Sequence, residues 1–210
     1  MGQQASSIQG PHRARSVTLA SGQSVPCELA VIAVGIEPSV ELARQAGLQI
    51  DNGVLVNEYM QTSQADMYAA GDLANYPDPF FHIRRRVEHW GQAEYTGSLA
   101  GANMAGGNAK KYDLLTYIWS DIFDLHLEFA GEEHDYDKVI LRGEMARDSF
   151  SLLQLRLGHL RAYYAVNVAK EEYKKLAQLI ERRVDLVGHE EQLRNAGFDL
   201  DELLKAPATT

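Results

Sequence analysis

A short, continuous apolar run near the amino terminus limits the possible folds more than any other feature of this sequence. Residues 29–34 read LAVIAV, and Gly35 and Pro38 end the run. An uninterrupted run of this length is typical of a strand that is buried on both faces of a parallel sheet. The sequence therefore predicts an α/β segment in its first half.

The residues around this run predict further short elements. Residues 16–19 alternate between polar and apolar and Ser21-Gly22 forms a turn, so residues 25–29 are expected to return as the second arm of a hairpin. Residues 1–12 show no period and are expected to be a loose end. Ser39 is placed to cap a short helix that runs to Ala46, and Gly47 is expected to end it.

Short strands are expected at residues 53–56 and 67–70, followed by a helix over about residues 87–104. The small residues at helical spacing suit close packing, and Gly106-Gly107-Asn108 is expected to end the helix. This segment offers only a few short strands and one long helix, too little to cover both faces of a sheet. We therefore expect that further chain is missing upstream.

The pattern changes after Lys111 and predicts a second, strand-rich α+β domain. Strands are expected at residues 125–129, 138–142, 150–157 and 160–168, the last two joined at Gly158-His159. An amphipathic helix is expected over residues 170–183, with shorter helical pieces at residues 190–195 and 200–204. The fold class is thus an α/β segment followed by an α+β domain.

Composition excludes several classes of function. The 210 residues carry 20 basic and 29 acidic side chains, a net charge of -9, which argues against a nucleic-acid-binding protein. The single cysteine, Cys27, excludes an intrachain disulfide and a four-cysteine zinc site. His134, Asp135 and Asp137 fit a solvated turn better than a metal site, so no metal is predicted. No apolar run reaches the about 18–20 residues of a membrane span, and a cytoplasmic protein is expected.

The strongest candidate site is Gly71-Asp72, which follows the strand expected at residues 67–70. Ligands of α/β folds bind at the carboxyl ends of strands. Gly71 lets a ligand approach the backbone, and Asp72 offers a carboxylate that accepts hydrogen bonds from a hydroxylated ligand. Taken from the residues alone, a Gly-Asp pair at a strand end is more often a capped turn than a ligand site.

Two further constellations carry chemistry. Residues 86–93, RVEHWGQA, open the long helix, whose amino terminus has unpaired N–H groups and partial positive charge. The alternative is a helix start whose basic run, residues 84–86, is merely solvated. Trp119 stands in the segment YIWSD, where a tryptophan between apolar neighbours is most often part of the core.

These segments resemble those of a known family. Residues 62–72 are similar to the second flavin-binding motif of the FAD-dependent pyridine-nucleotide oxidoreductases. Residues 29–38 resemble the apolar strand ending in Gly-x-x-Pro, where the chain of this family passes from the NAD domain back to the FAD domain. Residues 87–89 and 98–104 resemble the apoptosis-inducing-factor branch and its bacterial ferredoxin-reductase-like relatives.

The resemblance implies a role for each candidate residue. It implies that Asp72, next to Gly71, binds a ribityl hydroxyl of FAD. It places Glu88, His89 and Trp90 beside the isoalloxazine ring, with Ala93 in the same cofactor site and Trp119 flanking the ring. Leu114-Leu115-Thr116 stands where many relatives carry proline, which affects how Trp119 is presented. No catalytic residue is assigned.

The resemblance also implies three segments. Residues 1–37 correspond to the tail of the NAD(P)-binding domain, residues 38–110 to the second segment of the FAD-binding domain, and residues 111–210 to the C-terminal α+β reductase domain. The Gly-rich fingerprints of the family, G-x-G-x-x-G, are absent from the sequence. The chain is therefore expected to be about the last half of a normal enzyme.

Full-length relatives are expected to pass electrons from NAD(P)H through flavin to an acceptor, often a small iron–sulfur protein. This chain alone is expected to bind FAD weakly or not at all, not to bind NAD(P)H, and to be inactive. The alternative is a non-catalytic dimerisation or interaction module with a vestigial flavin half-site. Under either view an exposed apolar surface favours a homodimer or a complementing N-terminal half.

Overall fold

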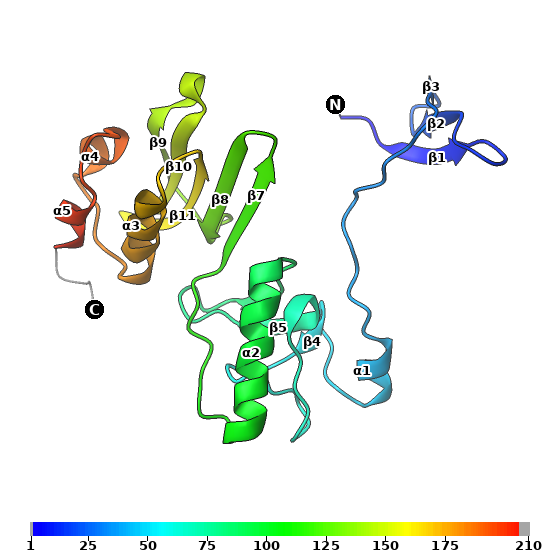
Figure 1. The fold of residues 1–210 in the computed structure, drawn as a ribbon, viewed down its shortest axis with the longest axis horizontal. Coiled ribbons are helices and arrows are strands. Elements are labelled where there is room, and N and C mark those ends of the chain that lie inside the picture. The colour runs from blue at the N-terminus through cyan, green and yellow to red at the C-terminus, as the bar shows by residue number, and fades with distance from the viewer. Residues whose placement is uncertain (1, 206–210) are drawn as a thin grey trace. The chain divides into compact units, whose positions relative to one another are not determined.

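The computed structural model describes residues 2–205 (Figure 1). Met1 and residues 206–210, at the outer ends of the first and last expected segments, lie outside the described part. The chain divides between Glu37 and Pro38 into two compact units.

The first unit is a three-stranded antiparallel sheet. It contains β1 (Ala5–Gln9), β2 (Ser16–Leu19) and β3 (Ser24–Pro26), in the order β1-β2-β3. The hairpin expected after residue 16 is confirmed. The expectation of a loose end over residues 1–12 was wrong at β1, whose mostly polar sequence gives little pattern because all five of its residues are exposed.

The buried strand expected at residues 29–34 is absent. These residues form no strand, and Leu29 is 79% and Val34 90% exposed. A strand exists only where a neighbouring strand takes its N–H and C=O groups. No strand of the described chain pairs with this segment, so its apolar residues are not part of a sheet that could bury them.

The second unit begins with a short helix and a small sheet. Helix α1 (Glu41–Gln45) starts after Val40, and the expected Ser39 cap was wrong because no side chain caps this helix. Strand β4 (Val54–Leu55) pairs in parallel with β5 (Ala74–Pro77), which pairs antiparallel with β6 (Arg84–Arg85). The strand expected at residues 67–70 was also wrong: one isolated bridge, Gln61 to Tyr68, stands there.

Helix α2 (Trp90–Gly106) is the long helix that the sequence predicts. Gly107 ends it in the left-handed conformation with φ 71°, as expected. The buried side chain of Asn103 donates to the carbonyls of Tyr59 and Lys110 and so holds two loops against the helix. The buried apolar residues of this part form one core: Val56, Met60, Ala74, Tyr76, Val87, Leu99, Ala100 and Tyr112.

The rest of the chain is built on a five-stranded antiparallel sheet in the order β7-β8-β11-β10-β9. Its strands are β7 (Tyr117–Ile122), β8 (Leu125–Gly131), β9 (Lys138–Glu144), β10 (Ser149–Arg156) and β11 (His159–Val166). The four expected strands are confirmed and β7 was missed. The β10–β11 turn is Leu157-Gly158, one residue earlier than expected, with φ 49° and 80°.

Helices close the chain against this sheet. Helix α3 (Lys170–Glu181) buries Tyr173, Leu176, Leu179 and Ile180, so the predicted amphipathic helix is confirmed. Two short helices follow, α4 (Glu190–Arg194) and α5 (Asp201–Leu204). The guanidinium of Arg142 donates to the carbonyls of Leu193, Asn195 and Phe198, which ties the α4 region to β9.

A buried ionic group joins the β5–β6 hairpin to the end of β8. Arg85 pairs with Asp78 at 2.6 Å and with Glu132 at 2.8 Å. Phe80 and Phe81 also pack against the core of the five-stranded sheet. Among residues 2–205, no helix is long and apolar enough to cross a membrane.

Candidate functional site

Gly71 lies in a tight turn against the first turns of α2. It opens the 3-10 helix η1 (Gly71–Leu73) with φ +67°, and its N–H donates to the hydroxyl of Thr96 at 2.9 Å. A Cβ at this position would lie 3.5 Å from the Cβ of Ala93. The pair Gly71-Asp72 therefore precedes strand β5 instead of following a strand, which corrects the expected strand-end position.

Asp72 is exposed and its carboxylate is free. Its backbone carbonyl accepts a hydrogen bond from Arg86 at 3.0 Å, and Arg86 also pairs with Glu88 at 2.8 Å. Within residues 2–205 the Asp72 carboxylate makes no hydrogen bond or ion pair. It can accept hydrogen bonds from the hydroxyl groups of a ligand.

The amino terminus of α2 is open. His89 is the N-cap residue, no side chain makes a capping hydrogen bond, and the first turn contains no acidic residue. The first N–H groups of a helix have no partner within the helix and carry partial positive charge. This end can therefore receive an electronegative atom of a ligand.

His89 connects α2 to the strand that carries Trp119. The backbone N–H of Trp119 donates to His89 Nε2 at 3.4 Å, and the two ring centroids lie 5.7 Å apart at 81°. Because Nε2 accepts this bond, the neutral ring carries its proton on Nδ1. Nδ1 is buried and has no hydrogen-bond partner among the described residues.

Trp90 and Trp119 line one cavity of about 380 Å³ together with Gly91, Glu94, Tyr95, Ser98, Leu114 and Tyr117. Trp90 is 71% and Trp119 40% exposed, so both rings are available for contact. Leu114, from the segment without the proline, forms part of this wall. Burial raises the pKa of Tyr95 to about 12, with its hydrogen bond to Asp113 as the second cause, so the phenol stays neutral near pH 7.

Gly91 is a residue of this cavity that sequence reasoning missed. A Cβ there would lie 3.2 Å from the Tyr117 hydroxyl and 3.4 Å from His89 Nδ1. A glycine in the first turn of a helix costs helix propensity, and that cost is the signal that could have identified it. Gly91 lets Tyr117 and His89 approach the helix closely.

The structure connects the candidate residues through a chain of contacts. Gly71 lies against Ala93, and Asp72 connects through Arg86 to Glu88. His89 meets Trp119, which shares a cavity with Trp90. The candidates therefore gather around the start of α2, where an acceptor carboxylate, free helix N–H groups and aromatic rings occur together.

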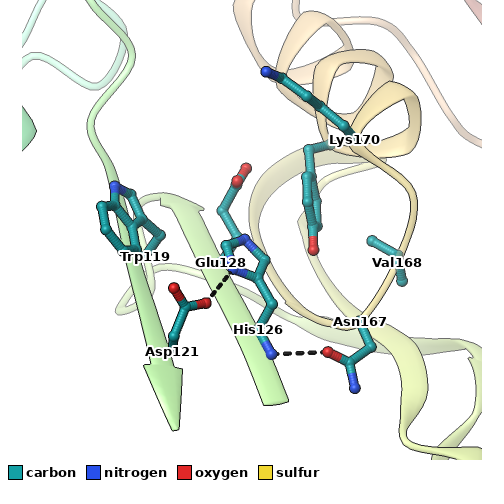
Figure 2. A pocket seen from close by; sticks show the side chains of 8 residues that line it. Trp119, Asp121, His126, Glu128, Asn167, Val168 and Lys170 are labelled. Atoms are coloured by element: carbon teal, nitrogen blue, oxygen red, sulfur yellow. Dashed lines mark hydrogen bonds and ion pairs between the residues drawn. The ribbon is translucent and has the colours of Figure 1, made fainter. Parts of the chain in front are cut away.

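A second cavity was not indicated by the sequence. It measures about 680 Å³ and lies between β7, β8 and the start of α3 (Figure 2). Trp119 lines this cavity as well as the one beside α2. Its other residues come from separate strands and from the start of α3. The sequence alone does not predict that they are neighbours, because neighbours across strands depend on strand register.

Two family models match the chain. Residues 1–97 match the pyridine nucleotide-disulphide oxidoreductases, and residues 117–204 match the reductase C-terminal domain. The chain is 35% identical over 196 residues to the 5,5'-dehydrodivanillate O-demethylase ferredoxin reductase subunit of Sphingobium sp., which covers 92% of this chain and 46% of that protein. It is 31% identical over 169 residues to putidaredoxin reductase of Pseudomonas putida, which covers 80% of this chain and 40% of that protein.

Solved structures agree with these matches. A ferredoxin reductase from Rhodopseudomonas palustris superposes with a TM-score of 0.85 at 31% identity, over 96% of this chain and 49% of that one. The covalent putidaredoxin reductase–putidaredoxin complex superposes with a TM-score of 0.87 at 27% identity, over 100% of this chain and 50% of that one. The chain spans about half the length of the relatives it matches. These matches show that the chain belongs to the pyridine nucleotide-disulphide oxidoreductase family, with part of its FAD- and NAD(P)-binding region followed by the C-terminal domain of its ferredoxin reductases.

Proposed function

We propose that this chain forms the ribityl and ring side of the FAD site in an NAD(P)H-dependent oxidoreductase. The whole enzyme passes electrons from NAD(P)H through flavin to an acceptor such as a ferredoxin-like protein. The relatives named above are ferredoxin reductases, and one is a complex with putidaredoxin. The observation that carries the proposal is the gathering of the Asp72 carboxylate, the uncapped α2 terminus and Trp119 through contacts of Gly71 and His89.

Each residue has a proposed role in holding the cofactor. Asp72 accepts a hydrogen bond from a ribityl hydroxyl, and Gly71 keeps the backbone beside Ala93 free of a side chain. The start of α2, with Glu88, His89 and Trp90, faces the isoalloxazine ring. The partial positive charge of that helix end stabilises negative charge on the ring. Trp119 flanks the ring from β7.

Aromatic walls and free N–H donors fit a flavin ring, and a free carboxylate fits its polyol chain. Bound FAD supplies the capacity to accept a hydride from NAD(P)H and to pass electrons on. The residues of this chain bind and orient the cofactor, and none is assigned as catalytic. We propose that the protein is located in the cytoplasm, as expected from the sequence.

The proposed division of the chain into three segments determines which cofactors we expect the isolated chain to bind. We propose that residues 1–37 belong to the NAD(P)-binding domain, residues 38–110 to the FAD-binding domain, and residues 111–210 to the C-terminal domain. The sequence contains no G-x-G-x-x-G fingerprint for a pyrophosphate. Alone, the chain is therefore expected to bind FAD weakly and to leave NAD(P)H unoxidised.

A second candidate function is a non-catalytic interaction module. The observation that favours it is the apolar segment at residues 29–36, where Leu29, Val31, Ile32, Val34 and Ile36 are 61–90% exposed. Exposed apolar side chains in a row mark an interaction surface. We propose that this segment pairs with a complementing N-terminal half, with a homodimer as the second form.

A flavin titration separates the two functions. The purified chain is titrated with FAD by fluorescence, alongside Asp72→Asn and the control Asp66→Asn, which changes an exposed aspartate of a neighbouring loop. Loss of one charge-assisted hydrogen bond weakens binding by about tenfold or more. Saturable weak binding that Asp72→Asn reduces and Asp66→Asn preserves supports the cofactor role. No binding to any of the proteins, with a dimer in solution, supports the interaction module.

A further inference from the structure

The second cavity is built on one face of the β7–β8 hairpin. Trp119 stands opposite Glu128, and Asp121 stands opposite His126, so all four side chains lie on the same face. Helix α3 covers this face over β8 and β11, and the cavity of about 680 Å³ stays open beside β7. Figure 2 shows the Glu128 side chain between Trp119 and α3.

Glu128 brings a partly desolvated carboxylate into this cavity. One oxygen accepts a hydrogen bond from the Tyr163 hydroxyl at 2.6 Å, and the other has no partner among residues 2–205. Burial raises the pKa of Glu128, while the Tyr163 bond and the charges of His126 and Lys170 act in the opposite direction. A carboxylate that has lost part of its hydration is stabilised by a cation that reaches its free oxygen.

Aromatic rings form the walls around that carboxylate. The rings of Trp119 and His126 are stacked at 6.4 Å and 21°, and His126 lies 5.8 Å from the ring of Tyr173. Asp121 fixes His126 through a contact of 2.6 Å to Nδ1. Tyr173 is 7% exposed, and its hydroxyl makes no hydrogen bond within the described chain. Of these rings, those of Trp119 and Tyr173 attract organic cations through their negatively charged faces.

Lys170 is the cation that lines this cavity. It opens α3 but forms no ion pair with Glu128 within residues 2–205, although its charge acts on that carboxylate. The cavity therefore has an ammonium of its own in addition to a carboxylate with one free oxygen. A bound cation would have to compete with the Lys170 ammonium for Glu128, so removing that ammonium should raise the affinity for the cation.

We propose that this cavity is a binding site for a small organic cation, an ammonium group carrying an aromatic ring. The ammonium donates to the free oxygen of Glu128, and the ring packs against Trp119 and His126. An anion of the same shape would face the carboxylates of Glu128 and Asp121 and is disfavoured. This site is independent of the flavin role, since only Trp119 belongs to both.

The test uses three probes of similar shape and different charge: 2-phenylethylammonium, neutral 2-phenylethanol and anionic 3-phenylpropionate. Binding is followed by Trp119 fluorescence in a Trp90→Phe background and by calorimetry on the unmodified chain. The ammonium is expected to bind at least about tenfold more tightly than either analogue, the value of one charge-assisted hydrogen bond. Equal affinity for the ammonium and the alcohol contradicts the proposal.

Two variants are expected to change the affinity for the ammonium in opposite directions. Glu128→Gln keeps an acceptor for Tyr163 and is expected to weaken the ammonium by about tenfold, whereas Lys170→Ala removes a competing cation and is expected to strengthen it. Glu144→Gln, an exposed change outside the cavity, is the matched control and is expected to leave affinity unchanged. An ammonium affinity that is unchanged in Glu128→Gln, or that falls in Lys170→Ala, overturns the proposal.

The pH dependence provides a second readout. As pH falls, protonation of Glu128 removes the carboxylate that binds the ammonium, so affinity decreases. The other titratable or charged groups that face Glu128 are His126, Tyr163, Lys170 and Asp121. The Gln variant lacks the Glu128 contribution, so its affinity is expected to fall less than that of the parent chain. An identical fall in both proteins overturns the assignment of Glu128 as the cation's partner.

Discussion

Removing Arg85 is expected to destabilise the protein strongly. Its guanidinium pairs with Asp78 at 2.6 Å and with Glu132 at 2.8 Å, and the three side chains are 13%, 0% and 10% exposed. Arg85→Met leaves the buried carboxylates of Asp78 and Glu132 without their cation, and breaking a buried ion pair in this way costs about 3–5 kcal/mol in proteins. The backbone N–H groups of Phe80 and Phe81 still donate to Asp78, at 2.8 and 3.0 Å, so we expect the lower end, about 3 kcal/mol.

Urea unfolding at neutral pH measures this loss. The control is Arg156→Met, which removes an arginine that is 45% exposed and pairs with Asp135 and Asp137 at 3.4 and 3.6 Å. Exposed pairs of this kind contribute at most about 1 kcal/mol. For a chain of this size the Arg85 variant should also unfold about 6–12 °C lower.

A double variant tests the cause. Asp78→Asn removes the more buried of the two stranded charges but keeps an oxygen for the two backbone donors, so Arg85→Met with Asp78→Asn should recover at least about 1 kcal/mol relative to Arg85→Met alone. The reasoning is refuted if Arg85→Met costs no more than Arg156→Met, or if the double variant is less stable than Arg85→Met.

Two further predictions follow from the backbone and from Glu128. Gly131→Ala should prevent stable folding, because φ is +107° and the new Cβ would lie 2.0 Å from the Arg161 carbonyl oxygen. Gly97→Ala meets open space in α2 and should raise the free energy of unfolding by about 0.5–1 kcal/mol. Thermal melts followed by circular dichroism compare the two variants. Burial holds the pKa of Glu128 above 4.5 in the folded state, so its contribution favours folding below pH 4.5 and is lost as pH rises through the folded pKa. Glu128→Gln should therefore gain stability relative to the parent chain between acid and neutral pH in urea melts, and a constant difference across that range would contradict this.

Local pattern predicted much of this fold because the pattern and the packing agree there. The α3 face with Tyr173 and Leu176 shows the helical period, and its buried residues match it. The four expected strands of the sheet were found for the same reason. Strand β7 was missed because Trp119 and Ser120 lie on an edge strand that is largely exposed, where alternation has little meaning.

The other failures have non-local causes. Residues 29–34 have the composition of a buried strand, but a strand also requires neighbours, which the described chain does not give them. The apolar residues before Gly71 predict a strand, whereas the parallel partner of β4 is β5, which begins at Ala74. The cavity at Glu128 depends on its register opposite Trp119, and no local sequence signal fixes that register.

We propose that the chain contacts the ribityl and ring parts of a flavin, and its sequence contains no G-x-G-x-x-G fingerprint for the pyrophosphate. The measurement that tests it most directly compares the affinities of riboflavin and FAD for the purified chain by fluorescence titration. Because pyrophosphate and adenosine gain no contact, we predict weak binding with an FAD-to-riboflavin affinity ratio of about one, and about tenfold weaker binding of both ligands to Asp72→Asn. Tight binding of FAD alone, or affinities that Asp72→Asn leaves unchanged, would contradict the claim.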